Sequence, residues 1–287
     1  MKFSITYDNI VFSLQKVGGI SVYWVELIKR VKQKNNEITF YESQNENIFR
    51  KEIDLNTKKE SSIRAKILRY LPFMKKLPPQ SLFHDSYYRV SLQKDVANIT
   101  TVYDFTYEYF RNGLAKYIHI WQKGFAIKRS DGIICISENT KKDLIKFYPQ
   151  IEQSKIKVIY VGIGDEFEKL ENSQEQLQNE FEILKNKIYI LYIGDRSGYK
   201  NFDIAVKVLE KMPDYSLAVV GGKEFDSSEK MMMHDIQNRV FYFSSIGGYM
   251  LNVLYNNALC LLYPSSYEGF GIPIAEAMRA GCPVVST

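Results

Sequence analysis

The feature that most constrains the fold is a repeated alternation of short apolar segments with longer helical segments. In the first half of the chain, segments with strand character occur at 2–7, 38–41, 81–84, 99–103, 132–136 and 157–161. Helical segments are expected near 20–34, 112–129 and 138–148, the last with Ser137 as its predicted N-cap. Strands that alternate with helices in this way predict a parallel sheet with crossover helices, which is a doubly wound α/β domain.

The same alternation starts again near residue 188 and predicts a second domain. Its strand-like segments lie at 188–193, 217–220, 240–243, 258–263 and 283–286. Between the two series, residues 165–187 are polar, mostly acidic and free of Gly and Pro, so we interpret them as a linker that leads into a surface helix. A length of 287 residues fits about two domains. We therefore predict Rossmann-like domains at 1–165 and 166–287.

The last predicted strand, 283–286, reaches the end of the chain at Thr287 with no helical segment after it. Parallel strands are normally covered by helices on both faces of their sheet. We therefore expect either a small second domain or a truncated version of a longer protein.

The charge is unevenly distributed between the predicted domains. Residues 1–165 carry 27 basic and 17 acidic groups, whereas residues 166–287 carry 11 and 16. Much of the excess lies in the basic segment 58–76, where apolar residues recur near helical spacing, at Ile63, Ile67, Leu71 and Met74. Such a segment can lie on an anionic membrane or pack its apolar stripe on its own domain. No recognised nucleic-acid-binding motif is present, so we do not expect a nucleic-acid partner.

Several features favour a cytoplasmic protein. The longest apolar runs, such as 188–193, are far shorter than the ~18 residues that a membrane span needs. Asp8 and Asn9 interrupt the place where a signal peptide would have its apolar core. The three cysteines are widely spaced and form no CxxC pair, which argues against a disulfide framework and a zinc site.

Ligands of open α/β sheets bind beyond the carboxyl ends of strands, next to helix N-termini, and two loops there draw attention first. Gly18 and Gly19 precede the first predicted helix, where they either allow a ligand to approach the backbone or form a flexible turn. Arg196 and Lys200 follow the first strand of the second domain, near a helix start where cations oppose the helix dipole. A bound diphosphate would offset that cost, and two solvated surface cations explain the pattern equally well.

The third loop, 264–281, combines two glutamates with two glycines. Pro273 is predicted to open a short helix that ends at Gly281, with Glu276 in its first turn and Glu268 in the loop before it. Gly269 and Gly271 would let backbone N–H groups face a ligand. A single acid at a helix start needs no ligand, but this combination favours a binding site.

The residues of this third loop resemble a known family. Glu268 and Glu276, in PSSYEGFGIPIAEAMRAGCPVV, resemble the E-x7-E signature of the retaining glycosyltransferases of family 4. Further similar segments are FSLQKVGGISVYWVEL, FHDSYYR, TTVYDFTYEYF, RSDGIICISENTKKDLIKFYP, KVIYVGIGDEF and YILYIGDRSGYKNFDIAVKVL. The family has the GT-B fold, with two Rossmann-like domains that face each other across a cleft. Because the family continues beyond Thr287, we expect the second domain to be incomplete.

The resemblance implies a role for each candidate residue. Arg196 and Lys200 would hold the donor diphosphate, and Glu268 would face the donor sugar. The remaining implied contacts are those of Glu276 with the nucleotide ribose, of Phe270 and Gly271 with sugar or phosphate through their backbone, and of Gly18 and Gly19 with the donor phosphates. The family often has His-Asp where this chain has Tyr103-Asp104, which places these two residues near the sugar.

The activity that the resemblance implies is transfer of a hexose from UDP- or GDP-hexose, with retention of anomeric configuration. The acceptor would be a saccharide or a lipid-linked molecule in cell-surface polysaccharide or glycolipid synthesis, at the inner face of the membrane. The chain has no D-x-D motif, so neither a metal nor another cofactor is expected. The alternatives are a catalytically weak nucleotide-sugar-binding or scaffold protein and a sugar-nucleotide epimerase. A nicotinamide dehydrogenase is disfavoured because no G-x-G-x-x-G follows a strand.

Overall fold

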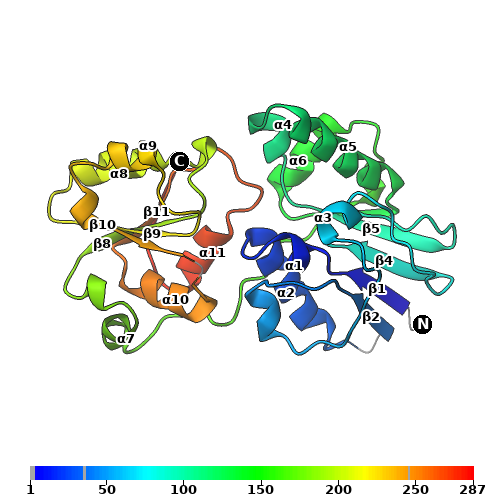
Figure 1. The fold of residues 1–287 in the computed structure, drawn as a ribbon, viewed down its shortest axis with the longest axis horizontal. Helices are drawn as coiled ribbons and strands as arrows, with labels where there is room; N and C mark the ends of the chain where they lie inside the picture. Colours follow the sequence, from blue (N-terminus) through cyan, green and yellow to red (C-terminus); the bar gives the residue numbers. More distant parts are fainter. Residues whose placement is uncertain (1–3, 35–36, 245) are drawn as a thin grey trace. The chain divides into compact units, whose positions relative to one another are not determined.

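The computed structural model describes residues 4–34, 37–244 and 246–287. The chain divides into two compact units, Met1–Gly162 and Ile163–Thr287, each built on its own parallel sheet (Figure 1). The prediction of two doubly wound α/β domains is therefore confirmed.

The sheet of the first unit has the strand order β3-β2-β1-β4-β5-β6-β7. Its strands are β1 (Ser4–Asp8), β2 (Glu37–Tyr41), β3 (Thr57–Lys58), β4 (Ser81–Asp85), β5 (Val96–Val102), β6 (Gly132–Cys135) and β7 (Ile156–Val158). The strand order reverses between β1 and β4, because β2 and β3 continue on one side of β1 and the later strands on the other. Residues 2–3 of the first predicted strand lie outside the described ranges. The short strand β3 was not predicted.

The helices of the first unit are α1 (Val11–Leu14), α2 (Gly19–Val31), α3 (Ala65–Leu68), α4 (Thr106–Phe110), α5 (Leu114–Arg129) and α6 (Glu138–Phe147), with 3₁₀ turns at Phe49–Glu52 and Gln153–Lys155. The predicted N-cap of α6 is confirmed, since the Ser137 hydroxyl accepts a hydrogen bond from the backbone N–H of Thr140 at 3.0 Å. The helix predicted near 112–129 corresponds to α5, and α4 precedes it as a separate turn.

The basic segment 58–76 does not form the continuous amphipathic helix that its spacing suggests. Its only α-helical part among the described residues is the four-residue α3. Pro72 cannot continue a helix because it has no backbone N–H to donate. The alternative that the predicted stripe packs on its own domain fails at two positions, because Ile67 and Met74 are exposed. The core instead receives Leu68 and Phe73 from this segment.

A buried arginine ties this segment to the first sheet. The Arg89 guanidinium binds both Glu60 carboxylate oxygens, at 2.8 and 2.9 Å, and also donates to the backbone carbonyls of Leu71 and Pro72. It forms a further ion pair of 2.6 Å with Asp8, the last residue of β1. These bonds satisfy the fully buried Arg89 guanidinium. They also hold the segment in an irregular conformation that the spacing of its apolar residues does not predict.

The second unit holds the sheet β10-β9-β8-β11-β12, and all five strands were predicted. They are β8 (Tyr189–Ile193), β9 (Ser216–Val220), β10 (Val240–Phe243), β11 (Cys260–Tyr263) and β12 (Val284–Ser286). Its helices are α7 (Ser173–Glu180), α8 (Phe202–Glu210), α9 (Ser227–Met232), α10 (Gly248–Asn257) and α11 (Ile272–Arg279), with 3₁₀ turns at Glu182–Leu184, Gly198–Lys200 and Gln237–Arg239. The order reverses between β8 and β11.

Alternate residues of β8 enter two cores, one on each face of this sheet. Tyr189 and Leu191 pack in one core, and Ile190 and Tyr192 in the other. The segment 165–187, predicted as a linker and surface helix, supplies Phe181 and Leu184 to the first of these cores through α7 and the turn after it. It is therefore a packed layer of the second unit as well as a connection.

Candidate active site

The candidate site lies in the second unit, where β8, β9 and β11 end. The three following loops span residues 194–201, 221–226 and 264–271. The first and third of these follow β8 and β11, the neighbouring strands between which the strand order reverses. In open α/β sheets this reversal point is where ligands bind, so the topology places the candidate residues at the expected position.

Direct hydrogen bonds join the loops after β8 and β11. Asn201, in the left-handed conformation at φ 50°, donates from its side-chain amide to the Pro264 carbonyl and to the Ser266 hydroxyl, both at 2.7 Å. The Ser266 backbone N–H donates to the Tyr199 carbonyl at 2.8 Å. The two loops therefore form one connected wall, which residue types alone did not reveal.

Lys200 and Glu268, predicted from separate loops, meet in this wall. The Lys200 ammonium lies 2.5 Å from the Glu268 carboxylate and 3.5 Å from the Tyr263 hydroxyl. The side chains of Lys200 and Glu268 are 13% and 24% exposed, so the pair is reachable from solvent although partly enclosed. Burial raises the pKa of Tyr263 well above its usual value, and the nearby Glu268 raises it further, so the phenol stays protonated.

Arg196 is bonded within the second unit to a different set of groups. Its guanidinium forms an ion pair with Glu229 at 2.7 Å and donates to the Gly221 and Lys223 carbonyls. It also lies over the Phe225 ring, 4.6 Å from the ring centroid, and its side chain is only 4% exposed. Of the two predicted cations, Lys200 is therefore partly exposed, whereas Arg196 is almost fully buried.

The partners of Arg196 come from the loop after β9, which the sequence analysis did not single out. Gly221 and Gly222 have φ angles of +89° and +75°, a conformation that favours glycine. A Cβ on Gly222 would lie 2.7 Å from the Arg196 guanidinium. The two adjacent glycines directly after an apolar strand were the available signal, because such pairs often mark a close approach of the backbone to another group.

Glu276 lies inside the unit, on α11. It is the fifth residue of this helix, so its predicted place in the first turn is wrong, and Pro273 is the second helical residue rather than the first. The Tyr255 hydroxyl donates to its carboxylate at 2.9 Å. Burial raises the pKa of Glu276 to about 7, against the opposing effect of the Tyr255 hydrogen bond. The carboxyl thus changes protonation state near neutral pH.

The start of α11 has a backbone conformation that favours glycine. Gly271 is the N-cap with a φ of +86°, which an L-residue seldom adopts. Gly269 and Gly271 are buried and Phe270 is half-buried between them. The first turn of α11 leaves backbone N–H groups without helical partners, and such groups suit an anion.

The residues predicted in the first unit lie at the start of α2 and in the loop between β5 and α4. Gly19 is the first residue of α2, and Gly18 caps it in extended backbone that does not require glycine. Tyr103 is buried and donates from its hydroxyl to the Ser86 carbonyl at 3.1 Å. The Asp104 side chain accepts from the Thr106 backbone N–H at 2.9 Å, and its carbonyl accepts from Lys123 at the same distance. Tyr103 and Asp104 thus have local structural bonds whether or not they contact a ligand.

Comparison with known protein families decides the class. Residues 17–167 match the model of "Glycosyltransferase Family 4", and residues 173–287 match "Glycosyl transferases group 1". The chain belongs to glycosyltransferase family 4. The first match covers the glycines at the start of α2 and strands β2 to β7, and the second covers all the loops of the candidate site.

Curated relatives of this family 4 chain include proteins of surface-polysaccharide synthesis. It is 29% identical over 164 residues to the O-antigen chain mannosyltransferase RfbU of Salmonella typhimurium, which is 56% of this chain and 43% of RfbU. It is also 29% identical over 174 residues to an uncharacterized 41.2 kDa protein in the cps region of Klebsiella pneumoniae, 60% of this chain and 46% of that protein. The match therefore spans less than half the length of these relatives.

Solved structures confirm the GT-B fold for the family 4 chain. WaaG, a glycosyltransferase involved in lipopolysaccharide biosynthesis, superposes with a TM-score of 0.68 at 16% identity, over 99% of this chain and 80% of WaaG. Anabaena HepE, solved with UDP and glucose, superposes with a TM-score of 0.71 at 15% identity, over 100% of this chain and 80% of HepE. At these identities the likeness concerns the fold.

The described residues of this family 4 chain contain neither a candidate metal-binding group nor a candidate membrane-spanning helix. Across residues 4–34, 37–244 and 246–287, no group of three or more His, Cys, Asp or Glu side chains could hold a metal ion. Within the same ranges, no helix has both the length and the apolar character that crossing a bilayer requires.

Proposed function

We propose that this chain transfers a hexose from a nucleotide-sugar donor, UDP- or GDP-hexose, to a saccharide or lipid-linked acceptor, with retention of anomeric configuration. The product would belong to a cell-surface polysaccharide or glycolipid. The observation that carries the proposal is the half-exposed Lys200–Glu268 pair beside the N-terminus of α11, at the reversal point of the second sheet. The family, and the naming of RfbU as a mannosyltransferase, give the class of reaction.

Lys200 is the group that we assign to the leaving diphosphate. During transfer, the bond between the anomeric carbon and the diphosphate oxygen breaks, and negative charge builds on the diphosphate. A cation fixed in a partly enclosed place stabilises that charge more strongly than water does, because it is already oriented. Glu268 holds Lys200 in position before the donor binds, and the donor phosphates would take over this partnership. We propose that this cation does the work that a metal ion does in other transferases.

The start of α11 supplies a second contact for the donor. The backbone N–H groups of the first turn of α11, which follows Gly271, suit a phosphate or a sugar oxygen. Glu276 follows on the same helix, and as a carboxylate it would accept hydrogen bonds from the ribose hydroxyls. With a pKa near 7, this carboxyl ionises more completely when hydroxyl donors reach it, which couples nucleotide binding to release of a proton.

Arg196 has a supporting role in this proposal. Its bonds to Glu229 and to the Gly221 and Lys223 carbonyls hold the loops after β8 and β9 together. Its positive charge still adds to the field at the donor phosphates. We assign the acceptor to the first unit, near the glycines at the start of α2 and near Tyr103 and Asp104.

The proposed function is tested by donor turnover with a matched pair of lysine variants. UDP-hexoses and GDP-hexoses are incubated with the chain in the presence of EDTA, and nucleoside diphosphate release is measured with and without saccharide acceptors. Lys200→Ala should lower the rate about 10²- to 10³-fold, as expected for loss of a group that stabilises transition-state charge. The control Lys207→Ala removes a lysine of α8 that is paired with Asp203 on the surface, and should leave the rate unchanged. Equal rates in both variants would contradict the assignment, and release only with a divalent ion would contradict the metal-free role of Lys200.

A further inference from the structure

Helix α5 presents a second apolar face to solvent. Its inner face packs into the first unit through residues that include Gln122, Ala126 and Ile127. On the opposite side, large apolar residues recur at helical spacing and are between 39% and 74% exposed: Leu114, Tyr117, Ile118, Trp121 and Phe125, here called the α5 face. Trp121 and Phe125 stack on each other with ring centroids 6.0 Å apart. A continuous exposed stripe of this size usually marks a surface that binds something.

The segments that carry and flank the α5 face are rich in basic residues. Residues 109–130 contain Arg111, Lys116, Lys123, Lys128 and Arg129 and no Asp or Glu. The segment before β4 lies against this helix, because the Gln122 side chain donates to the Arg69 carbonyl at 2.6 Å. Residues 61–84 of that segment contain Arg64, Lys66, Arg69, Lys75 and Lys76 and again no Asp or Glu. Of these ten cations, Lys123 is neutralised by the buried Glu108.

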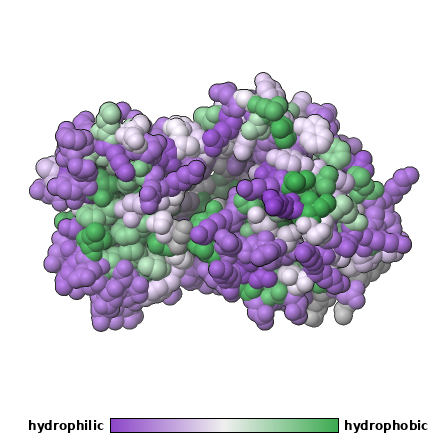
Figure 2. Space-filling model, in the orientation of Figure 1, coloured by the Kyte–Doolittle hydropathy of each residue, from purple (hydrophilic) through white to green (hydrophobic). Residues whose placement is uncertain are grey.

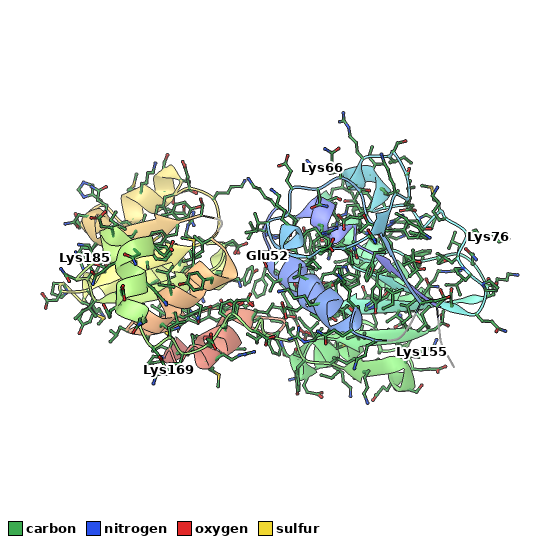
Figure 3. All side chains as sticks on the ribbon, turned by 90° about the horizontal axis from the view of Figure 1, so that it is seen from below. Glu52, Lys66, Lys76, Lys155, Lys169 and Lys185 are labelled. Carbon is green, nitrogen blue, oxygen red and sulfur yellow. The ribbon has the colours of Figure 1, made fainter. Side chains whose placement is uncertain are left out.

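Hydrophobic residues reach the surface of the first unit over the area of α3 and α5 (Figure 2). Lys66 and Lys76 project from the first unit toward solvent (Figure 3). Ile67, Tyr70 and Met74, the exposed apolar residues of the neighbouring segment, extend the apolar area beside these lysines.

We propose that the α5 face binds the surface of a membrane that contains anionic lipids. Aromatic rings with a polar edge, such as Trp121 and Tyr117, suit the boundary between headgroups and acyl chains. The surrounding Lys and Arg side chains are attracted to lipid phosphates, at about 1 kcal/mol each near an anionic surface. A second copy of the chain is a poorer occupant, because two faces with the same excess of basic residues would repel each other. The expected basic amphipathic element thus belongs to α5, with 58–76 as its basic flank.

Vesicle binding tests the α5 face directly, and it needs no donor or acceptor. The purified chain is mixed with vesicles of phosphatidylcholine alone or with phosphatidylglycerol, and binding is measured by co-sedimentation. We expect binding only with phosphatidylglycerol, weakened by salt. Tyr117→Ser/Trp121→Ser should lower the partition coefficient about tenfold or more, and Lys128→Ala/Arg129→Ala about tenfold. Met231→Ser, an exposed residue of α9 in the second unit, is the matched control and should not change it.

Fluorescence gives an independent measurement, because the chain has two tryptophans and Trp24 is fully buried. A blue shift on addition of phosphatidylglycerol vesicles therefore reports on Trp121. Trp121→Phe should keep binding in co-sedimentation and lose the shift. Full binding by the double aromatic variant, no binding by the wild type, or a dimer in sedimentation velocity that the double variant abolishes would overturn the proposal. Each variant should melt at the wild-type temperature, since the altered side chains are exposed.

Discussion

The two units share a parallel sheet with one reversal point, but the charged residues at these points are bonded in opposite ways. In the first unit, Asp8 ends β1 and pairs with the fully buried Arg89, which also binds Glu60. In the second unit, Lys200 follows β8 and pairs with Glu268, and both side chains remain partly exposed. The same topology thus brings charges to one edge of each sheet. Whether that edge can serve as a binding site depends on what already satisfies the charges there.

The neighbouring carboxyl of the first unit follows the same rule. Asp85 ends β4 and accepts a hydrogen bond from the Thr100 hydroxyl at 2.9 Å, and burial raises its pKa to about 7. The buried ions of the first unit therefore contribute to its architecture. For the second unit we propose that a ligand replaces one of the paired groups.

The largest effect should come from Arg89→Met, which removes the cation of the first reversal point. Asp8 and Glu60 would be left in a buried place without their shared partner, and breaking such a network costs about 3–5 kcal/mol of unfolding free energy. Chemical denaturation measures this. Lys200→Met is the comparison, and it should change the unfolding free energy by at most about 1 kcal/mol, because its pair is partly solvated. Equal losses in the two variants would remove the distinction between the reversal points.

The second effect separates binding from stability at Lys200. Lys200→Ala should weaken binding of the donor nucleotide about tenfold and lower turnover about 10²- to 10³-fold, because the charge on the leaving diphosphate grows during the reaction. Titration calorimetry and a coupled rate assay measure the two quantities. A variant with normal affinity and normal turnover would show that the partly exposed Lys200–Glu268 pair is only a surface contact.

Much of the fold and several of the candidate site residues could be predicted from the sequence. Except for the short β3, the strands of both sheets follow from short apolar runs between helical segments, and Ser137 was identified as a cap from its place before α6. Lys200 and Glu268 were both found, because each lies in a loop directly after a strand. Their mutual pairing was not, since 68 residues separate them and only the strand order brings them together.

Where the sequence prediction failed, side-chain partners distant in sequence determine the structure. The segment 58–76 has helical spacing, yet Arg89 holds it through Glu60 and two carbonyls, and Pro72 interrupts it. Arg196 was predicted to bind phosphate from its place in the loop after β8. Its ion pair with Glu229 could not be predicted, because the two residues are distant in sequence. The exposed side of α5 was missed because an apolar stripe facing solvent has the same spacing as one facing the core.

The third effect is the part of the pH dependence of stability that comes from Glu276. Because burial raises its pKa to about 7, the folded state binds the proton more tightly than the unfolded state does. Its contribution to stability is therefore largest at low pH and declines as the pH rises from about 4.5 to 7. Glu276→Gln should consequently be more stable than the wild type at pH 8, by about 1–3 kcal/mol, and this advantage should vanish near pH 4.

Nucleotide affinity should show the opposite trend at this residue. In the wild type it should strengthen as the pH rises through about 7, where Glu276 becomes a carboxylate able to accept from ribose hydroxyls. In Glu276→Gln the affinity should be several-fold lower at pH 8 and nearly independent of pH. Parallel pH profiles for the two proteins, measured by calorimetry, would show that Glu276 is only a structural partner of Tyr255.

The smallest effect concerns the wall between the loops after β8 and β11. Asn201→Gly keeps the left-handed backbone and removes the hydrogen bonds to Pro264 and Ser266, which should cost about 1 kcal/mol of stability and weaken nucleotide binding two- to fivefold. Asn186→Gly is the matched control, with a similar φ of 60° on the far side of β8. It should leave nucleotide binding unchanged. If the control had the same effect on binding, the change would come from the backbone and not from the wall.

The most direct test of the central claim is titration calorimetry of UDP and GDP against the chain in EDTA, repeated with Lys200→Ala and Lys207→Ala. The loops after β8 and β11, which hold the partly exposed Lys200–Glu268 pair, should bind one of the two nucleotides without a metal. Lys200→Ala should weaken that binding about tenfold, and Lys207→Ala should match the wild type. Absence of binding by a chain that unfolds cooperatively, or equal affinities in all three proteins, would contradict the assignment of this site to a nucleotide-sugar donor.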